Sequence, residues 1–247
     1  MRYFIELSYL GTHYHGWQTQ PNAVTVQQTV EKALSLLLRY PIKITGAGRT
    51  DTGVHARQMF AHFDTTIPFN PSELTYKLNS FLPEDIAIHQ IFSVHSQIHA
   101  RFDAVSRSYS YYIHQRKNPF LNKTSWYFKK KLDIEKMNMA SNILLSYTDF
   151  KSFSKVHTDV KTYICHIKTA RWKQTDQQLV FSITADRFLR NMVRAIVGTL
   201  IDVGTGRTSI DEFIKIIELK NRNNAGFSVP AKGLFLEKIA YNKQIKL

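Results

Sequence analysis

The chain has 247 residues, 43% of them hydrophobic, and a formal net charge of +14. A chain of this length buries roughly 70% of its unfolded surface, enough for one large or two small domains. Its single cysteine, Cys165, excludes an internal disulfide and any multi-cysteine zinc site, as is typical of a reducing compartment. The first residues contain no long apolar run, so we expect a cytoplasmic protein without a signal peptide or a membrane span.

The basic residues are unevenly distributed along the chain. Residues 1–105 carry 8 Lys and Arg against 8 Asp and Glu, whereas residues 106–247 carry 25 against 11, so the whole excess lies in the second part. Such an excess favours a polyanionic partner, because cations neutralise phosphates and release counterions. A basic surface that only confers solubility is the alternative. We predict two halves, 1–105 and 106–247, of which the second grips an anionic ligand.

Local patterns predict the elements of the first half. Residues 2–9 alternate with a period of two and predict a strand. Thr25 and Gln28 have the spacing of a capping box for a helix that runs to about Tyr40. Asn70-Pro71 starts a second helix, with proline in its first turn. Further strands are expected at residues 42–45, 54–63 and 86–94.

The second half shows the same mixture of elements. Asp133 is placed to cap one helix, and Ser209 opens another with a capping box that ends at Glu212. A third helix is expected over residues 188–203, before Gly204. Strands are expected at residues 106–114, 162–172, 179–184 and 234–241. Strands with two or more helices in each half predict the α+β class.

A glycine-rich segment lies between the strands expected at residues 42–45 and 54–63. Gly46, Gly48 and Gly53 allow a tight loop close to a ligand, and Arg49 and Asp51 lie two residues apart, so both side chains can face one cleft. The spacing fits neither a Walker A loop nor the dinucleotide-binding fingerprint. The alternative is an ordinary turn in which the Asp51 side chain bonds its own backbone.

Histidines near this segment raise the possibility of a metal site. His55 and His62 follow Asp51 closely, and a metal-assisted nucleotide hydrolase would use all three. The zinc deaminase motifs are missing from the sequence, however, and isolated histidines are more often surface or core residues. We expect no metal.

Three arginines follow a helical spacing. Arg187, Arg190 and Arg194 lie at i, i+3 and i+7 of the expected helical segment Arg187–Gly198, within about 60° of one another. The stripe faces either solvent or an anionic cleft. Arg194 is flanked by apolar residues, so its charge needs a fixed anionic partner, for which Asp51 is the candidate.

Aromatic residues alternate with a basic one in the strand expected at residues 106–114. Arg107, Tyr109 and Tyr111 fall on one strand face. A tyrosine beside an arginine can stack on a base while the arginine bonds phosphate. Ordinary strand tyrosines with polar tips at the surface are the alternative.

Taken together, these segments resemble the tRNA pseudouridine synthase A family over nearly the whole chain. Two positions depart from the usual pattern: Ile98 replaces a phenylalanine and Lys161 an arginine. The resemblance is carried, in this order, by Tyr9-Leu10-Gly11, Gly16-Trp17-Gln18, Gly48-Arg49-Thr50-Asp51-Thr52-Gly53-Val54-His55-Ala56, His99-Ala100-Arg101-Phe102-Asp103-Ala104, Arg107-Ser108-Tyr109-Ser110-Tyr111, Met192-Val193-Arg194-Ala195-Ile196-Val197-Gly198 and Pro230-Ala231-Lys232-Gly233-Leu234.

The resemblance implies a role for each site residue. Asp51 is the nucleophile, and Arg194 keeps it ionised and oriented. Tyr109 stacks on the target base and assists removal of the C5 proton, while Arg49 holds the displaced nucleotide. The remaining substrate-binding residues are His99, Ala100, Arg101 and Phe102 of the tRNA-contacting segment, and Arg187 and Arg190 of the basic stripe.

The implied reaction is the isomerisation of uridine to pseudouridine in the anticodon stem-loop of tRNA, at positions 38–40. It requires no cofactor. The implied fold is α+β, with two related halves that share a mostly antiparallel sheet, helices packed on it and a central RNA-binding cleft. The implied assembly is a homodimer. A non-catalytic RNA-binding protein and the metal-assisted hydrolase remain as alternatives.

Overall fold

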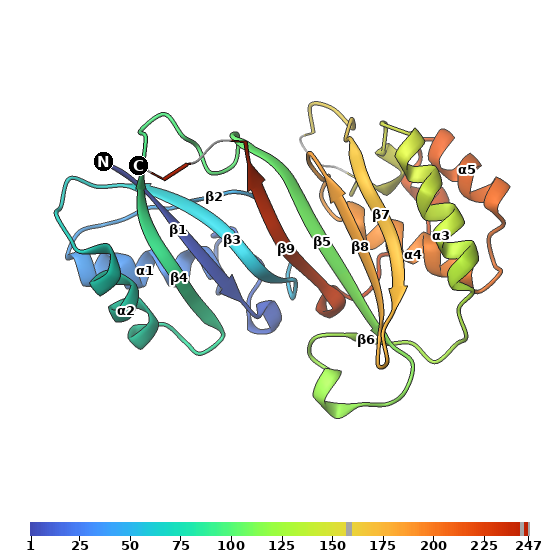
Figure 1. Cartoon of the computed structure of the whole chain (residues 1–247), viewed down its shortest axis with the longest axis horizontal. Helices are drawn as coiled ribbons and strands as arrows, with labels where there is room; N and C mark the ends of the chain where they lie inside the picture. Colours follow the sequence, from blue (N-terminus) through green and yellow to red (C-terminus); the bar gives the residue numbers. More distant parts are fainter. Residues whose placement is uncertain (157–159, 243–244, 247) are drawn as a thin grey trace. The chain divides into compact units, whose positions relative to one another are not determined.

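A computed structural model describes residues 1–156, 160–242 and 245–246 (Figure 1). The chain forms two units. The first unit consists of Met1–Val105 together with Leu236–Leu247, and the second of Ser106–Phe235. The last strand of the chain therefore returns to the unit in which the chain began. Among the helices described, none is both long and apolar enough to cross a membrane.

The first unit is built on a sheet with the strand order β4-β1-β3-β9. The central strand β1 is antiparallel to both β3 and β4, and a short strand β2 pairs with the far end of β3. Both faces of β1 are largely buried, as its period of two predicted. The strands are β1 (Arg2–Tyr9), β2 (Thr45–Gly46), β3 (His55–Asp64), β4 (Ile86–Val94) and β9 (Leu234–Tyr241).

Two capped helices complete the first unit. Helix α1 (Val26–Leu38) starts where the Thr25 side chain accepts a hydrogen bond from the Gln28 N–H at 3.3 Å. Helix α2 (Pro71–Phe81) starts at Asn70, whose side chain accepts from Ser72 N and Glu73 N. The two helices contact each other, and α2 lies along β4 (Figure 1). Both predicted helix starts are confirmed. They are predictable because each capping bond joins residues that are close in the sequence.

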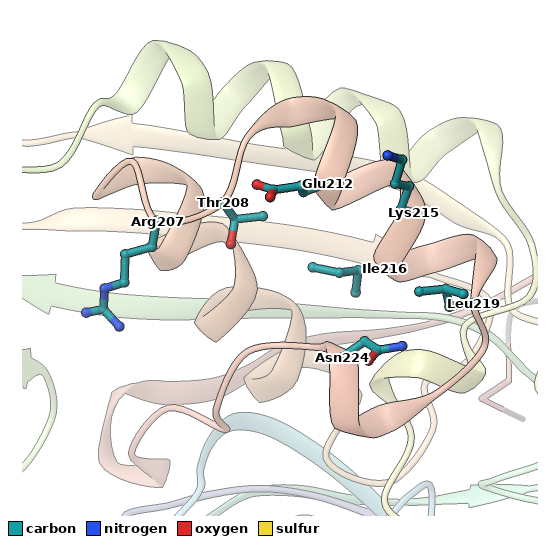
Figure 2. Close-up of a pocket in the computed structure, with 7 residues that line it drawn as sticks. All are labelled: Arg207, Thr208, Glu212, Lys215, Ile216, Leu219 and Asn224. Atoms are coloured by element: carbon teal, nitrogen blue, oxygen red, sulfur yellow. The ribbon is translucent and has the colours of Figure 1, made fainter.

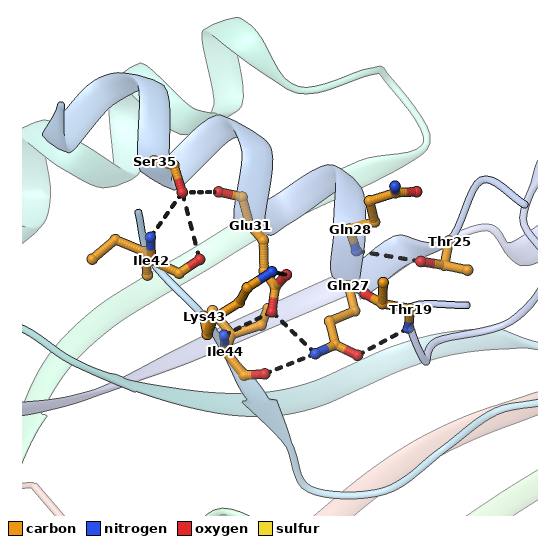
Figure 3. A network of polar contacts seen from close by, with 9 residues as sticks. All are labelled: Thr19, Thr25, Gln27, Gln28, Glu31, Ser35, Ile42, Lys43 and Ile44. Carbon is orange, nitrogen blue, oxygen red and sulfur yellow. Dashed lines mark hydrogen bonds and ion pairs between the residues drawn. The ribbon is translucent and has the colours of Figure 1, made fainter. Parts of the chain in front are cut away.

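A buried carboxylate ties α1 to the segment that enters β2 (Figure 3). The Glu31 side chain is buried, and its Oε1 accepts hydrogen bonds from Ile44 N at 3.0 Å and Gln27 Nε2 at 3.1 Å. Its Oε2 pairs with the exposed Lys43 Nζ at 3.1 Å. The Gln27 amide also donates to Ile44 O at 2.9 Å and accepts from Thr19 N. The carboxylate thus fixes the chain just before the glycine-rich loop.

We predict that Glu31→Ala lowers the free energy of unfolding by about 2–3 kcal/mol, because it leaves the buried Ile44 N–H without its acceptor. Glu31→Gln keeps one acceptor oxygen and is expected to cost about 1 kcal/mol. The control is Glu73→Ala, which removes an exposed pair with Lys77 and is expected to cost about 0.5 kcal/mol. Urea denaturation measures all three variants. Equal losses at Glu31 and Glu73 would show that the buried carboxylate contributes no more than a surface charge.

The second unit contains a three-stranded antiparallel arrangement, β5-β8-β7, and a short strand β6 that runs parallel to β5. Helices α3, α4 and α5 contact one another, and α3 packs along β7 (Figure 1). The capping box predicted at Ser209 is present. The elements are β5 (Ala104–His114), β6 (Trp126–Tyr127), β7 (Ile167–Gln174), β8 (Leu179–Ala185), α3 (Ile134–Ile143), α4 (Met192–Gly204) and α5 (Ile210–Glu218).

In the part of the chain that the structure describes, six short 3-10 helices connect these elements. They are η1 (Gly11–His13), η2 (Pro119–Leu121), η3 (Leu144–Ser146), η4 (Lys151–Phe153), η5 (Arg222–Asn224) and η6 (Ala231–Gly233). With strands that are mostly antiparallel and helices packed on them, the predicted α+β class is confirmed.

Two predicted boundaries in the second unit are wrong. The helix expected over residues 188–203 begins at Met192, because Asn191 has a left-handed backbone with φ of +66° and cannot continue a helix. The strand expected over residues 162–172 begins at Ile167. Before it, Tyr163 and Cys165 form backbone hydrogen bonds with residues 148–150 instead of joining β7.

Candidate active site

Asp51 lies in the loop of residues 47–54 that joins β2 to β3, as the sequence predicted. Its side chain is half-buried, whereas Arg49 is exposed and Thr50 between them is buried. The Asp51 carbonyl accepts from Val54 N at 3.1 Å, and Gly53 has φ of +76°. The backbone of the segment is therefore a turn, closed by a bond to the carbonyl of Asp51.

The residues on both sides of Asp51 are held by the end of β1 and the segment that follows it. Thr50 O accepts from Trp17 N at 3.2 Å, and Thr50 Oγ1 is 2.8 Å from the Tyr9 hydroxyl. On the other side, Gly53 N donates to Tyr14 O at 3.3 Å. A nucleophile needs a fixed position, and these bonds supply it. The sequence alone gives no individual role to Tyr9 or Tyr14.

Glycines make this close approach possible. A Cβ at Gly16 would lie 3.2 Å from Asp51 C and closer still to Thr50 O, and Gly16 has φ of +85°. A Cβ at Gly11 would lie 2.7 Å from Val54 C and closer still to its oxygen. Side chains at these positions would push the loop away, so the glycines between β1 and α1 support the loop that carries Asp51.

The two histidines near the loop have structural roles. His55 is fully buried, and its Nδ1 accepts from Gly11 N at 2.9 Å. His62 Nδ1 accepts from Ala100 N at 3.2 Å, and burial, reinforced by the charge of Arg2, lowers the pKa of His62 to about 4. Within the described part of the chain, no group of three or more His, Cys, Asp or Glu residues is placed to hold a metal ion.

The segment from His99 to Phe102 forms a rigid, partly exposed surface in the first unit. His99 Nδ1 accepts from Arg101 N at 3.1 Å and Phe102 N at 3.3 Å, and its ring stacks on the Phe102 ring at 4.3 Å. Phe102 is 75% exposed, and the Arg101 guanidinium lies 5.7 Å from the centre of its ring. Ala100 is buried and its carbonyl accepts from the Tyr241 hydroxyl at 2.7 Å. An exposed ring beside a cation suits contact with RNA.

Tyr109 lies in β5 of the second unit, opposite Ile183 of β8. Its ring is half-buried and meets the Phe188 ring edge to face at 5.1 Å. Arg107 donates to Asp186 O at 2.9 Å. Tyr111 is fully buried, and its hydroxyl donates to Pro230 O at 2.8 Å. Of the two tyrosines, only Tyr109 is open enough to meet a base.

The three arginines predicted on one helix do not share it. Only Arg194 lies in α4, whereas Arg187 and Arg190 precede its first residue, so the predicted helical stripe is wrong. Arg194 Nε donates to Val229 O at 2.7 Å, which fixes its guanidinium. Arg187 is half-buried and donates to Thr162 O at 3.2 Å, and Arg190 is exposed. The pairing of Arg194 with Asp51 stays a prediction.

A hollow of about 320 Å³ lies beside α5 in the second unit (Figure 2). Two of the charged side chains that line it have internal partners. Glu212 accepts from Ser209 N at 2.7 Å in the capping box, and Arg207 pairs with Asp202 at 3.1 Å. None of the site residues predicted from the sequence lines this hollow.

Comparison with known proteins identifies the family. The family model described as tRNA pseudouridine synthase matches residues 7–103 and 142–242. The chain belongs to the tRNA pseudouridine synthase family. The two matched stretches fall in the two predicted halves, and the first contains the whole Asp51 loop.

Curated relatives extend over the full chain. The chain is 54% identical over 250 residues to the tRNA pseudouridine synthase A of Porphyromonas gingivalis, covering 100% of this chain and 99% of the relative. It is 53% identical to that of Parabacteroides distasonis, covering 99% and 97%. A more distant relative with the same name, from Staphylococcus aureus, is 36% identical and covers 97% and 91%.

Proposed function

We propose that this protein isomerises uridine to pseudouridine in the anticodon stem-loop of tRNA, at positions 38–40. The observation that carries the proposal is that the family's full-length relatives are named tRNA pseudouridine synthase A, while Asp51 sits on a loop fixed from both sides. No observation favours a protein that binds RNA without catalysis. We also propose that it acts as a homodimer in the cytoplasm.

The reaction needs a nucleophile and a positioned base, and no external reactant. The Asp51 carboxylate attacks either C1′ of the ribose or C6 of the uracil, and the bond between N1 and C1′ breaks. The uracil rotates and C5 bonds to C1′. The bond between Asp51 and the substrate breaks, which regenerates the carboxylate, and the C5 proton leaves while N1 gains a proton. Atoms and electrons balance without a cofactor, because substrate and product are isomers.

Other residues hold the substrate in this proposal. Tyr109 stacks on the flipped uracil and assists removal of the C5 proton, and Arg194 keeps Asp51 ionised and oriented. Arg49, which is exposed beside Asp51, helps to hold the displaced nucleotide. The tRNA-contacting residues are His99, Ala100, Arg101, Phe102, Arg187 and Arg190. Ala100 is buried and anchors this segment, since its N–H and its carbonyl bond to His62 and Tyr241.

The purified protein is expected to release tritium from tRNA labelled at C5 of uridine, and mapping of the product places pseudouridine at positions 38–40. The turnover persists in EDTA, because no step uses a metal. Unmodified tRNA transcribed in vitro is the substrate, and the same tRNA with cytidine at positions 38–40 is the control. Release of tritium from the control at the same rate would contradict the proposed positions, and no release from either would contradict the proposed function.

A further inference from the structure

The second unit carries a loop whose charge is of one sign. Residues 115–131, which we call the basic loop, join β5 to the start of α3 and contain no Asp or Glu. The second unit as a whole has 22 Lys and Arg against 10 Asp and Glu. The six cations of the basic loop are all exposed: Arg116, Lys117, Lys123, Lys129, Lys130 and Lys131.

A phenylalanine stands out at the tip of the basic loop. Phe120 is 92% exposed, more than any other large hydrophobic residue described. An aromatic ring that is almost fully exposed is open to a ligand, and here it lies among six exposed cations. Stacking on a nucleobase would cover the ring, and every base has a face that suits it.

The loop presents Phe120 on a structured turn. Phe120 lies in η2, where the Asn118 side chain accepts from Phe120 N at 3.0 Å and the Asn118 carbonyl accepts from Leu121 N at 3.3 Å. Lys232, which lies outside the loop, donates to Asn122 Oδ1 at 3.0 Å. An ordered turn loses little entropy when its exposed ring meets a ligand.

The base of the basic loop is also fixed. Gln115 Nε2 donates to Lys130 O at 2.7 Å, and Phe128 N donates to His114 O at 3.0 Å. The Lys129 ammonium lies 5.7 Å from the centre of the Tyr127 ring. These contacts bring the lysines at the end of the loop back to its beginning.

We propose that the basic loop is a further RNA-binding surface, on which Phe120 stacks with an unpaired base while the surrounding cations contact phosphates. The proposal rests on the proposed function, which makes tRNA the substrate. The catalytic and substrate-binding residues assigned above all lie outside residues 115–131. The surface therefore adds affinity for the substrate without taking part in the isomerisation.

A second copy of the chain is the less suitable partner. In a two-fold dimer built on this loop, the same patch would meet itself, and six cations would face six cations. Repulsion between these cations opposes such a contact, whereas the phosphates of RNA neutralise their charge.

The test measures tRNA affinity of the full chain in Phe120→Ala, with tRNA transcribed in vitro as the probe. Loss of one stacked base is expected to weaken binding about 5- to 150-fold. The rate at saturating tRNA stays unchanged, and Phe120→Trp restores the affinity. The matched control is Tyr76→Ala, which removes a ring that is 74% exposed in α2 of the first unit and is expected to bind tRNA as the wild type does.

A second variant tests the cations. Replacing Lys129, Lys130 and Lys131 together by glutamine is expected to reduce the slope of log affinity against log salt concentration by about 2, if each lysine contacts a phosphate. Unchanged affinity in Phe120→Ala together with an unchanged salt slope overturns the proposal. The proposal is also overturned if either variant changes its sedimentation coefficient but not its tRNA affinity. That result would show that the loop serves self-association. If the wild type releases tritium in the same assay, these outcomes overturn the role of the basic loop but not the proposed function.

Discussion

Asp51→Asn is expected to reduce tritium release from C5-labelled tRNA by at least about 1000-fold, because an amide lacks the nucleophilic carboxylate oxygen that the reaction requires. The affinity for tRNA is expected to stay within about twofold of the wild type, since most of the binding energy comes from phosphate contacts elsewhere. The backbone hydrogen bonds of Thr50, Gly53 and Val54 do not involve the Asp51 side chain, so the turn persists in the variant. The variant is therefore expected to lose catalysis and to keep its affinity for tRNA.

A matched control is Asp176→Asn, which makes the same chemical change at an exposed position in the turn between β7 and β8. It is expected to turn over like the wild type. Single-turnover assays with enzyme in excess over tRNA compare the two variants, and filter binding measures their affinity. Substantial release of tritium from Asp51→Asn would exclude Asp51 as the nucleophile, and parallel loss in both variants would point to an effect of charge alone.

Much of the fold follows from short-range signals. The helix starts at Asn70, Asp133 and Ser209 were predictable because a side chain caps an N–H only two or three residues away. Strands such as β1 were predictable because a period of two shows which residues share a face. In each case the pattern and its cause lie within one element.

Other features depend on contacts that no local pattern encodes. Strand β9 joins the sheet of the first unit from the end of the chain, although its own sequence shows only that it is a strand. The start of α4 depends on the left-handed backbone of Asn191, which separates Arg187 and Arg190 from the helix of Arg194. The helical spacing of the arginines therefore predicted one continuous stripe, but the helix begins only after Arg187 and Arg190.

The candidate site also has a part that the sequence predicts and a part that it does not. The segment from Gly48 to Gly53 could be assigned to a loop from the sequence, and the run from Gly48 to Ala56 to a family. The supports of that loop could not, because they join residues that are distant in the chain. Tyr9 meets Thr50 across 41 positions, and Gly11 donates to His55 across 44. Gly11 and Gly16, between β1 and α1, lie so close to the backbone of the Asp51 loop that a side chain would not fit, and the sequence does not show this proximity.

Gly11→Ala is expected to disturb both stability and turnover. The added Cβ would overlap the carbonyl of Val54, which is buried backbone and has no flexible end that could move aside. Relief requires a shift of Gly11 or of the start of β3, and this weakens the bond from Gly11 N to His55 Nδ1. We expect a loss of about 3 kcal/mol in the free energy of unfolding. Since Val54 closes the turn of Asp51, turnover is expected to fall roughly 100-fold in protein that remains folded.

Gly48→Ala is the control for stability, because it adds the same methyl group to the same loop where no atom lies within 4 Å. Its free energy of unfolding is expected to stay within about 0.5 kcal/mol of the wild type. Urea denaturation compares the two variants, and tritium release is measured below the unfolding transition of Gly11→Ala. If Gly11→Ala is as stable and as active as the wild type, the contact with Val54 does not position the loop. If it is destabilised but fully active when folded, Gly11 supports the fold and leaves the placement of Asp51 to Gly16, Trp17 and Tyr9.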